Sequence, residues 1–162
     1  MTSKQLFADL LYDKMKRDDR VVFITADLGF NLWNKIQTDF PTRYFNCGAS
    51  EQLMMGLGIG LALSGKIPVV YSITPFLLYR PFEWIRNYID FENIPVKMIG
   101  SGRNKDYSHD GISHWAEDDA HIMSVFKNII SFYPSTHESL QREFNELIDS
   151  NSPVYLNLST RL

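Results

Sequence analysis

The sequence predicts an α/β protein with a doubly wound, mainly parallel sheet and helices on both faces. Short apolar runs alternate with segments of helical apolar spacing from one end of the chain to the other, as in sheets built from strand–helix–strand units. The runs are continuously apolar, which is typical of strands buried on both faces. The 162 residues suit one compact domain, so we expect a single domain over residues 1–162.

The expected elements follow one another without a linker or repeat. A first helix is expected after Ser3, a candidate N-terminal cap, and it ends at Asp18 and Asp19. Strands are expected at residues 21–25, 43–48, 67–72, 95–101, 128–134 and 153–159. Further helices are expected at residues 32–39, 50–64, 77–90, 116–125 and 136–149, and a long polar loop at residues 102–114. Because ligands bind beyond the carboxyl ends of parallel strands, we expect the functional residues in the segments that follow the strands.

The composition argues against several classes of function. The formal net charge of −3 gives no sign of a surface for nucleic acid or for a membrane. No stretch is apolar enough to span a bilayer, and the N-terminal segment lacks the apolar run of a signal peptide. Cys47 is the only cysteine, so a reducing compartment is expected. We therefore expect a cytoplasmic protein with neither nucleic acid nor membrane among its partners.

A glycine-rich stretch, NCGASEQLMMGLGIGLALSG, occupies residues 46–65. A dinucleotide fingerprint requires G-x-G-x-x-G in the turn before a helix, whereas Gly56, Gly58 and Gly60 have the spacing G-x-G-x-G inside the expected helix. The later S-G-K is followed by isoleucine, so a P-loop is excluded as well. We interpret Gly56 and Gly60 as packing positions on one helix face, where another backbone can approach closely.

Glu51 stands at the start of this helix, where the helix dipole favours an ionised carboxylate. By itself it is typical of an ordinary first-turn acid. Its surroundings form a longer pattern, however. RYFNCGASEQLMMGLGIGLALSG resembles the segment of transketolases, and of the related deoxyxylulose-phosphate synthases, that carries the glutamate contacting the aminopyrimidine of thiamine diphosphate.

Three further segments resemble the same family in the same order. TADLGFN resembles the A-D-L segment that follows the family's first strand. Residues 67–101 resemble its strand, aromatic loop and helix, with Arg80 and Arg86 at the R-x-x-x-x-x-R spacing. SHDGISHWAEDDAHI resembles its D-G-x-[ST]-H-x-x-x-[ED]-D segment. The chain thus resembles the pyrimidine-binding domain of a transketolase-like enzyme, as a stand-alone subunit.

The resemblance assigns a catalytic role to Glu51. In this family a carboxyl group hydrogen-bonded to ring N1′ promotes the imino tautomer of the cofactor, whose own 4′-amino group then removes the proton from thiazolium C2. By resemblance Glu51 is that carboxyl group. An aspartate would be one methylene short, and a glutamine could not exchange the proton.

Three other residues are expected at the cofactor. The pyrimidine needs a flat apolar partner, and Phe76 is the candidate for stacking, with Tyr79 nearby. A core position is the alternative for Phe76. Asp27 lies in the loop after the first strand, beside the expected cofactor edge, although it is equally typical of a loop-capping residue.

The D-G-x-[ST]-H match implies that Asp110 and His114 face a sugar substrate, with His114 able to bond hydroxyls or move protons. These residues do not predict a metal site, because no further ligand falls at a recognised spacing. Arg103 and Lys105 in the same loop can bind a phosphate or be solvated, and the sequence leaves both open.

Half of the cofactor site is missing from the sequence. The family holds the diphosphate through Mg²⁺ with a G-D-G motif in another domain, and this chain has none. We therefore expect a separate diphosphate-binding G-D-G subunit that supplies the Mg²⁺ ligands, in a heterotetramer. The expected reaction is transfer of a two-carbon ketol unit between sugar or sugar-phosphate substrates. A two-chain 2-oxo-acid decarboxylase or carboligase, and a non-catalytic binding subunit, remain as alternatives.

Overall fold

A computed structural model describes residues 1–161 and contains one six-stranded sheet. Every pair of neighbouring strands is parallel, in the order β2-β1-β3-β4-β6-β5. The strands are β1 Val21–Thr25, β2 Tyr44–Asn46, β3 Ile67–Ile73, β4 Lys97–Ser101, β5 Ile130–Phe132 and β6 Val154–Leu158. The predicted fold class is confirmed.

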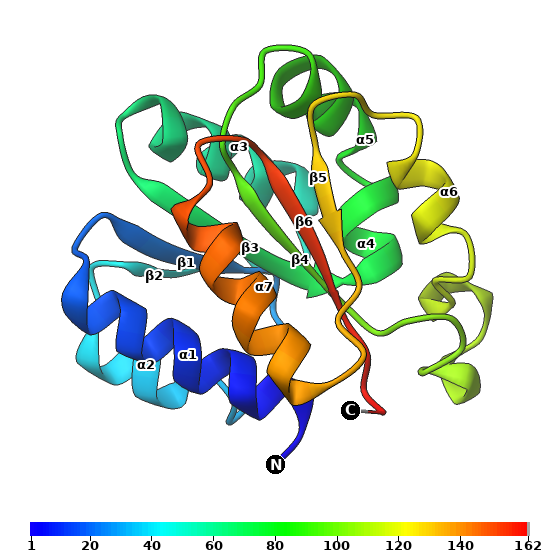
Figure 1. The fold of residues 1–162 in the computed structure, drawn as a ribbon, viewed down its shortest axis with the longest axis horizontal. Coiled ribbons are helices and arrows are strands. Elements are labelled where there is room, and N and C mark those ends of the chain that lie inside the picture. The colour runs from blue at the N-terminus through cyan, green and yellow to red at the C-terminus, as the bar shows by residue number, and fades with distance from the viewer. Residues whose placement is uncertain (162) are drawn as a thin grey trace.

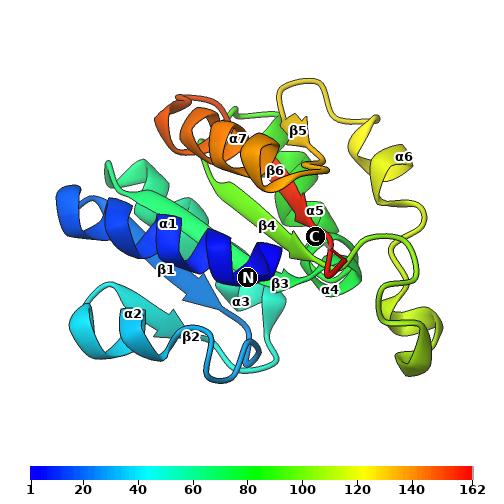
Figure 2. The same cartoon turned by 60° about the horizontal axis from the view of Figure 1, so that its bottom comes forward.

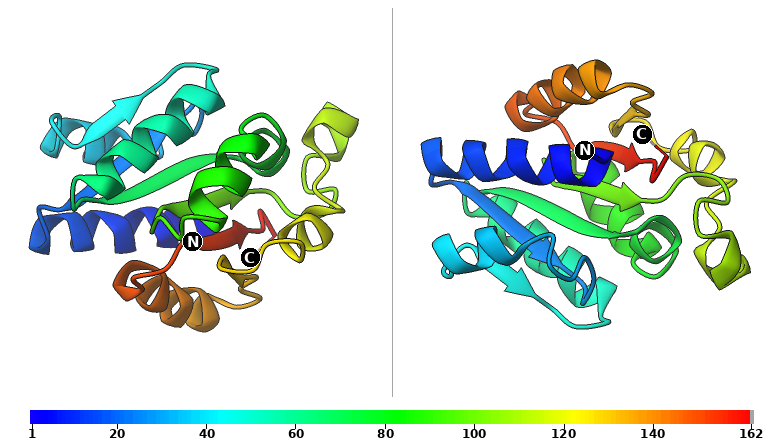
Figure 3. Two further views of the ribbon diagram at one scale, coloured as in Figure 1. Left: turned by 90° about the horizontal axis from the view of Figure 1, so that it is seen from above. Right: turned by 90° about the horizontal axis from the view of Figure 1, so that it is seen from below.

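Helices cover both faces of this sheet. They are α1 Ser3–Arg17, α2 Asn34–Asp39, α3 Glu51–Leu63, α4 Thr74–Tyr79, α5 Phe82–Trp84, α6 Asp119–Met123 and α7 His137–Asp149, with a π-helical segment η1 Ile85–Asp90. Helices α1 and α7 lie side by side across one face (Figure 1). The views along the sheet show α3, α4 and α5 on the other face (Figure 3).

Two apolar cores result, one on each face of the sheet. Neighbouring residues of β1 divide between them, because successive side chains of a strand point to opposite faces. Val21 and Phe23 pack under α1 and α7, whereas Val22 and Ile24 pack with α3 and α4. The central strands are therefore buried on both faces, which explains their continuously apolar sequences.

Two predicted helix boundaries are wrong. Thr2, not Ser3, is the N-cap of α1, and Thr2 accepts a hydrogen bond from the backbone of Gln5. Ser3 is buried, and its hydroxyl donates to the carbonyl of Ser159, so it ties the two ends of the chain together. The helix expected at residues 77–90 is instead α4, α5 and η1, which begin earlier and are broken before Pro81, a residue that cannot continue a helix from the preceding turn.

The glycines of α3 differ from each other in their surroundings. A Cβ added to Gly58 would lie 3.0 Å from Cγ1 of Val70, so this position packs closely on the sheet. A Cβ at Gly56 would meet the Trp84 ring at an ordinary 3.5 Å, and one at Gly60 would meet nothing within 4 Å. Within this chain the structure shows no backbone approach at Gly60, and the nearest atoms at Gly56 belong to the Trp84 ring; the tightest contact is that of Gly58 with the Val70 side chain.

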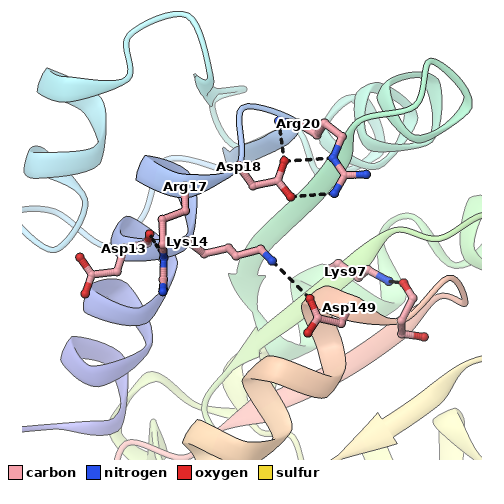
Figure 4. A network of polar contacts seen from close by, with 8 residues as sticks. Asp13, Lys14, Arg17, Asp18, Arg20, Lys97 and Asp149 are labelled. Carbon is pink, nitrogen blue, oxygen red and sulfur yellow. Dashed lines mark hydrogen bonds and ion pairs between the residues drawn. The ribbon is translucent and has the colours of Figure 1, made fainter.

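The amino ends of the strands carry a polar network between α1, α7 and β4 (Figure 4). Lys14 of α1 pairs with Asp149 of α7 at 3.2 Å. Lys97 is 1% exposed, and its Nζ donates to the carbonyl oxygens of Ser150 at 2.7 Å and Ser152 at 2.8 Å. It therefore satisfies the carboxyl end of α7. Burial lowers the pKa of Lys97 to about 8.

The opposite edge, at the carboxyl ends of the strands, carries the segments expected to hold the site. The chain between β4 and α6 contains two short 3-10 turns, η2 Ser108–Asp110 and η3 Ile112–His114, and it projects beyond the sheet (Figure 2). Within residues 1–161, none of the helices has the length and apolarity that a bilayer crossing requires.

Candidate active site

Glu51 is the first residue of α3 and is only 3% exposed. The turn that precedes it contains Gly48 at φ +67°, a conformation that favours glycine, and this turn aims the helix start at the end of β3. The carboxylate accepts hydrogen bonds from the Ser72 hydroxyl at 3.4 Å and from Arg80 Nη1 at 2.8 Å. A buried carboxylate is thus presented at the edge of the sheet with one charged partner.

Arg80 follows α4 and contacts two of the candidate residues. Its Nη1 reaches Oε2 of Glu51, and its guanidinium carbon lies 3.8 Å from the centroid of the Phe76 ring. Phe76 and Arg80 are four residues apart along α4 and its continuation, which places them on one face. The guanidinium is therefore stacked on the ring while it pairs with the carboxylate.

Phe76 is a half-buried residue of α4, and neither apolar core includes it. The Phe76 ring also contacts His114 in a T-shaped arrangement, with the two ring centroids 4.9 Å apart. The structure therefore brings together Glu51, Phe76 and His114, three of the residues predicted for the site. The arrangement argues against the core alternative for Phe76.

His114 and Asp110 occupy different turns of the projecting segment. His114 ends η3, and its Nδ1 lies 2.9 Å from the Ser113 hydroxyl. Asp110 is in η2, exposed, with its carboxylate 3.2 Å from Nε2 of His109. His114 thus borders Phe76, whereas Asp110 lies on the preceding turn with its carboxylate turned to His109.

Tyr79 lies at the end of α4, and its hydroxyl hydrogen-bonds to Asp118 at the start of α6. The pKa of Tyr79 is raised by burial and by the Asp118 carboxylate. This contact ties α4 to the end of the projecting segment. The ring remains 41% exposed.

Asp27 follows β1 with φ +50° and is exposed. Its backbone N–H donates to Asn46 Oδ1 at 2.9 Å, and its carboxylate accepts from Asn46 Nδ2 at 3.4 Å. The same Asn46 oxygen accepts from the backbone of Gly48. Asp27 therefore joins the loop after β1 to the turn that orients Glu51.

A buried polar network under the site was not predicted from the sequence. Asn157 Nδ2 and the Tyr155 hydroxyl each donate to Asp119 Oδ2 at 2.8 Å. Thr74, the first residue of α4, donates to the carbonyl of Gly102, which also accepts from Asn157 at 3.0 Å. Burial raises the pKa of Asp119, and the hydrogen bonds from Tyr155 and Asn157 oppose this shift. The network fixes α4, and so Phe76, against the base of the segment that carries His114.

Arg103 is part of this internal structure. Its Nε donates to Asn157 Oδ1 at 3.0 Å, and its Nη2 donates to the carbonyls of Pro134 at 3.1 Å and Asn157 at 2.9 Å. Phosphate binding, one of the two roles left open for Arg103, is therefore not supported by its contacts. Lys105 lies on the surface, 3.3 Å from Glu117.

The geometry accommodates a planar group that carries nitrogen atoms at its edge. A guanidinium is flat and donates hydrogen bonds from its edge, and here it is held by the Glu51 carboxylate and the Phe76 face together. An aminopyrimidine offers the same flat face and nitrogen edge, so Glu51 and Phe76 fit this part of thiamine diphosphate. Across residues 1–161, no cluster of three or more histidine, cysteine or acidic side chains is arranged for a metal ion.

The site is an open surface of this chain. A cavity of about 800 Å³ lies at the same edge, between the start of α1 and residues 28–32, but the described residues that line it include neither Glu51 nor Phe76. The side chain of Arg80, which pairs with Glu51, is 45% exposed, and Tyr79 is a 41% exposed residue. A ligand bound at Glu51 would remain open to solvent on the side away from α4.

Comparison with known proteins supports the same family. The model of the transketolase pyrimidine-binding domain matches residues 1–162. A putative transketolase C-terminal section of Methanocaldococcus jannaschii is 29% identical over 96% of this chain and 49% of its own length. A 6-deoxy-6-sulfo-D-fructose transketolase subunit of a Clostridium species is 28% identical over 98% of this chain and 49% of its own length.

A solved structure described as a split-gene transketolase, inactive β4 tetramer, superposes with a TM-score of 0.87 at 27% identity. The alignment covers 99% of this chain and 51% of that one. The chain thus spans about half the length of these relatives. The sequence resemblance is confirmed over the full length of the chain, and the chain belongs to the transketolase pyrimidine-binding domain family.

Proposed function

We propose that this chain is the pyrimidine-binding subunit of a split, thiamine-diphosphate-dependent transketolase-like enzyme. The reaction is transfer of a two-carbon ketol unit between sugar-like substrates. The observation that carries this proposal is the buried Glu51 carboxylate, which shares Arg80 as a contact with the Phe76 ring, and the T-shaped contact of His114 with that ring. The family and the subunit or split character of the relatives support it.

Thiamine diphosphate, when bound, supplies the carbanion chemistry of ketol transfer. Glu51 holds a proton at N1′ of the pyrimidine and orients the ring. The Ser72 hydroxyl donates to the second carboxylate oxygen and so helps to orient the carboxyl group. Phe76 supports the face of the ring. Tyr79 and Asp27 border the cofactor and hold the surrounding segments in place through Asp118 and Asn46.

His114 and Asp110 are assigned to the substrate. His114 bonds sugar hydroxyls or moves protons at the reacting carbons, since its imidazole is half-buried beside Phe76. Asp110 is exposed and accepts a hydrogen bond from a substrate hydroxyl in exchange for its contact with His109. Two such groups on one segment favour a polyol or sugar phosphate over a simple 2-oxo acid.

The diphosphate and its Mg²⁺ are assigned to a separate subunit with a G-D-G motif, which the subunit and split-gene descriptions of the relatives support. The open face of the site fits completion by another polypeptide. We propose a heterotetramer of two copies of each chain, acting in the cytoplasm. A cofactor held between two chains would make activity depend on their association.

Glu51→Gln in the assembled enzyme tests the proposal. The amide keeps the size of the side chain but cannot exchange the proton, so we expect kcat to fall by about 10²–10⁴-fold while the cofactor still binds. Glu83→Gln is the matched control, since Glu83 is an exposed acid of α5. Full activity of Glu51→Gln would support a non-catalytic binding subunit. Turnover of 2-oxo acids but not ketoses by the wild-type pair would support a decarboxylase or carboligase.

A further inference from the structure

Arg80 occupies both recognition elements of the proposed pyrimidine site. Its Nη1 donates to Glu51 Oε2 at 2.8 Å, and its guanidinium lies 3.8 Å from the Phe76 ring centroid. The Glu51 side chain is 2% exposed, so this oxygen is accessible to few groups at a time. The ring face is likewise covered by one planar group.

A guanidinium and an aminopyrimidine compete for the same two positions. Each is planar and stacks on an aromatic face, but the guanidinium donates to an ionised carboxylate, whereas ring N1′ accepts the proton that a carboxyl group carries. One carboxylate oxygen and one ring face accommodate either group but not both together. The Arg80 contacts and the contacts assigned to the cofactor are therefore mutually exclusive, and this inference rests on the function proposed above.

Arg80 can leave the site without a change of fold. Its side chain is 45% exposed, so a rotation about its own torsions moves the guanidinium into water. Its backbone is held independently, because the Arg80 carbonyl accepts from Gln52 Nε2 at 3.3 Å. The departure of Arg80 leaves the Glu51 carboxylate without this charged partner, and the cofactor ring takes its place.

We propose that Arg80 is an internal competitor of the aminopyrimidine, which pairs with Glu51 and covers Phe76 until the cofactor displaces it. The measured association constant is then the intrinsic association constant multiplied by the fraction of molecules in which Arg80 is out of the site. An exposed charged group with one hydrogen bond and one ring contact is a weak competitor, so we expect a reduction of about fivefold to tenfold.

Arg80→Gln tests this proposal, with Arg86→Gln as the matched control. Arg86 is exposed and contacts Asn87, and the substitution Arg86→Gln removes the same charge as Arg80→Gln does. The dissociation constant of thiamine diphosphate is measured by calorimetry on the chain purified with its partner. We expect Arg80→Gln to bind about fivefold to tenfold more tightly and Arg86→Gln to bind as the wild type does. Equal or weaker binding by Arg80→Gln would overturn the competitor role.

A second measurement uses the unaltered chain, in case Arg80→Gln folds poorly. The side-chain N–H and methylene resonances of Arg80 are followed by NMR, assigned with Arg80→Lys, while 4-amino-2-methylpyrimidine is added. We expect them to lose the ring-current shift from Phe76 in step with saturation. Resonances that stay unchanged at saturation would overturn the proposal and leave the proposed function intact. Binding of neither probe to any variant would remove the proposed function, and the competitor role with it.

Discussion

The imidazole of His114 is edge-on to the ring of Phe76, with centroids 4.9 Å apart. One residue comes from α4 and the other from the segment that projects beyond the sheet, and Thr74, Gly102 and Asn157 fix the bases of both. A residue assigned to the cofactor and one assigned to the substrate are therefore in direct contact. A substitution of Phe76 is therefore expected to affect both cofactor binding and substrate binding.

Phe76→Leu removes the flat partner of the pyrimidine and the aromatic ring that contacts His114. We expect thiamine diphosphate to bind about threefold to tenfold more weakly, because an aromatic contact contributes about 0.5–1.5 kcal/mol beyond area. The His114 ring resonances should also shift when the Phe76 ring current is lost. Phe91→Leu is the control, since Phe91 is 77% exposed. Unchanged affinity together with shifted His114 resonances would remove Phe76 from the cofactor site.

Asn157→Leu breaks the network beneath the site. The substitution keeps the volume but leaves Asp119, Arg103 and the Gly102 carbonyl each short of a partner. Arg103 Nε loses its acceptor Asn157 Oδ1, whereas Asp119 Oδ2 keeps the bond from Tyr155 and the Gly102 carbonyl keeps the bond from Thr74. We therefore expect the free energy of unfolding to fall by about 1–3 kcal/mol, measured by urea denaturation. Asn151→Leu, at an exposed position, should change it by less than about 0.5 kcal/mol. Equal stability of the two variants would contradict the structural role of the network.

Gly58→Ala and Gly60→Ala are expected to have opposite effects. Alanine favours a helix by about 1 kcal/mol over glycine, and nothing lies within 4 Å of a Cβ at Gly60, so Gly60→Ala should stabilise the isolated chain. At Gly58 the added methyl would meet Val70 at 3.0 Å, and overpacking of about 1–3 kcal/mol should outweigh the gain. Thermal denaturation of both variants checks the sign. Stabilisation by Gly58→Ala would show that the sheet yields there.

Lys97 should make stability depend on pH in the alkaline range. Its pKa is lowered to about 8 in the folded chain, from the ordinary 10.5, because it is buried. Between these values the unfolded chain binds a proton that the folded chain does not, so the contribution of Lys97 to stability rises with pH. Below pH 8 the charge is carried in both states, and its burial costs the full amount.

Lys97→Met isolates this contribution (Figure 4). The difference in the free energy of unfolding between wild type and Lys97→Met is measured from pH 7 to pH 10. We expect the difference to move in favour of the wild type above pH 8 as the amine loses its charge and keeps its bonds to Ser150 and Ser152. A difference that is constant with pH would show that Lys97 titrates as an exposed lysine does.

Much of this arrangement could be predicted from the sequence. The continuous apolar runs specify buried parallel strands, and the carboxyl ends of such strands meet at one edge, so Glu51 and the segment holding His114 were expected there. The roles of Glu51, Phe76, Tyr79, Asp27, Asp110 and His114 stay predictions, because contacts alone do not establish catalysis.

Other features depend on contacts between distant residues. The pairing of Arg80 with Glu51 joins two segments that are far apart in the sequence. The four-residue spacing between Phe76 and Arg80 indicates their mutual contact but not the contact with Glu51. The Asp119–Asn157 bond joins α6 to β6, and no short-range pattern encodes it. The break before Pro81 follows from proline chemistry, which an expectation of one helix over residues 77–90 does not take into account.

The most direct test of the central claim is capture of the tagged chain from its native host, with identification of the accompanying chains and assay of bound thiamine diphosphate. We expect an equimolar partner with a G-D-G motif and one cofactor for each copy of this chain. A chain recovered alone and free of cofactor would contradict it, because Glu51 and Phe76 would then have no aminopyrimidine to hold.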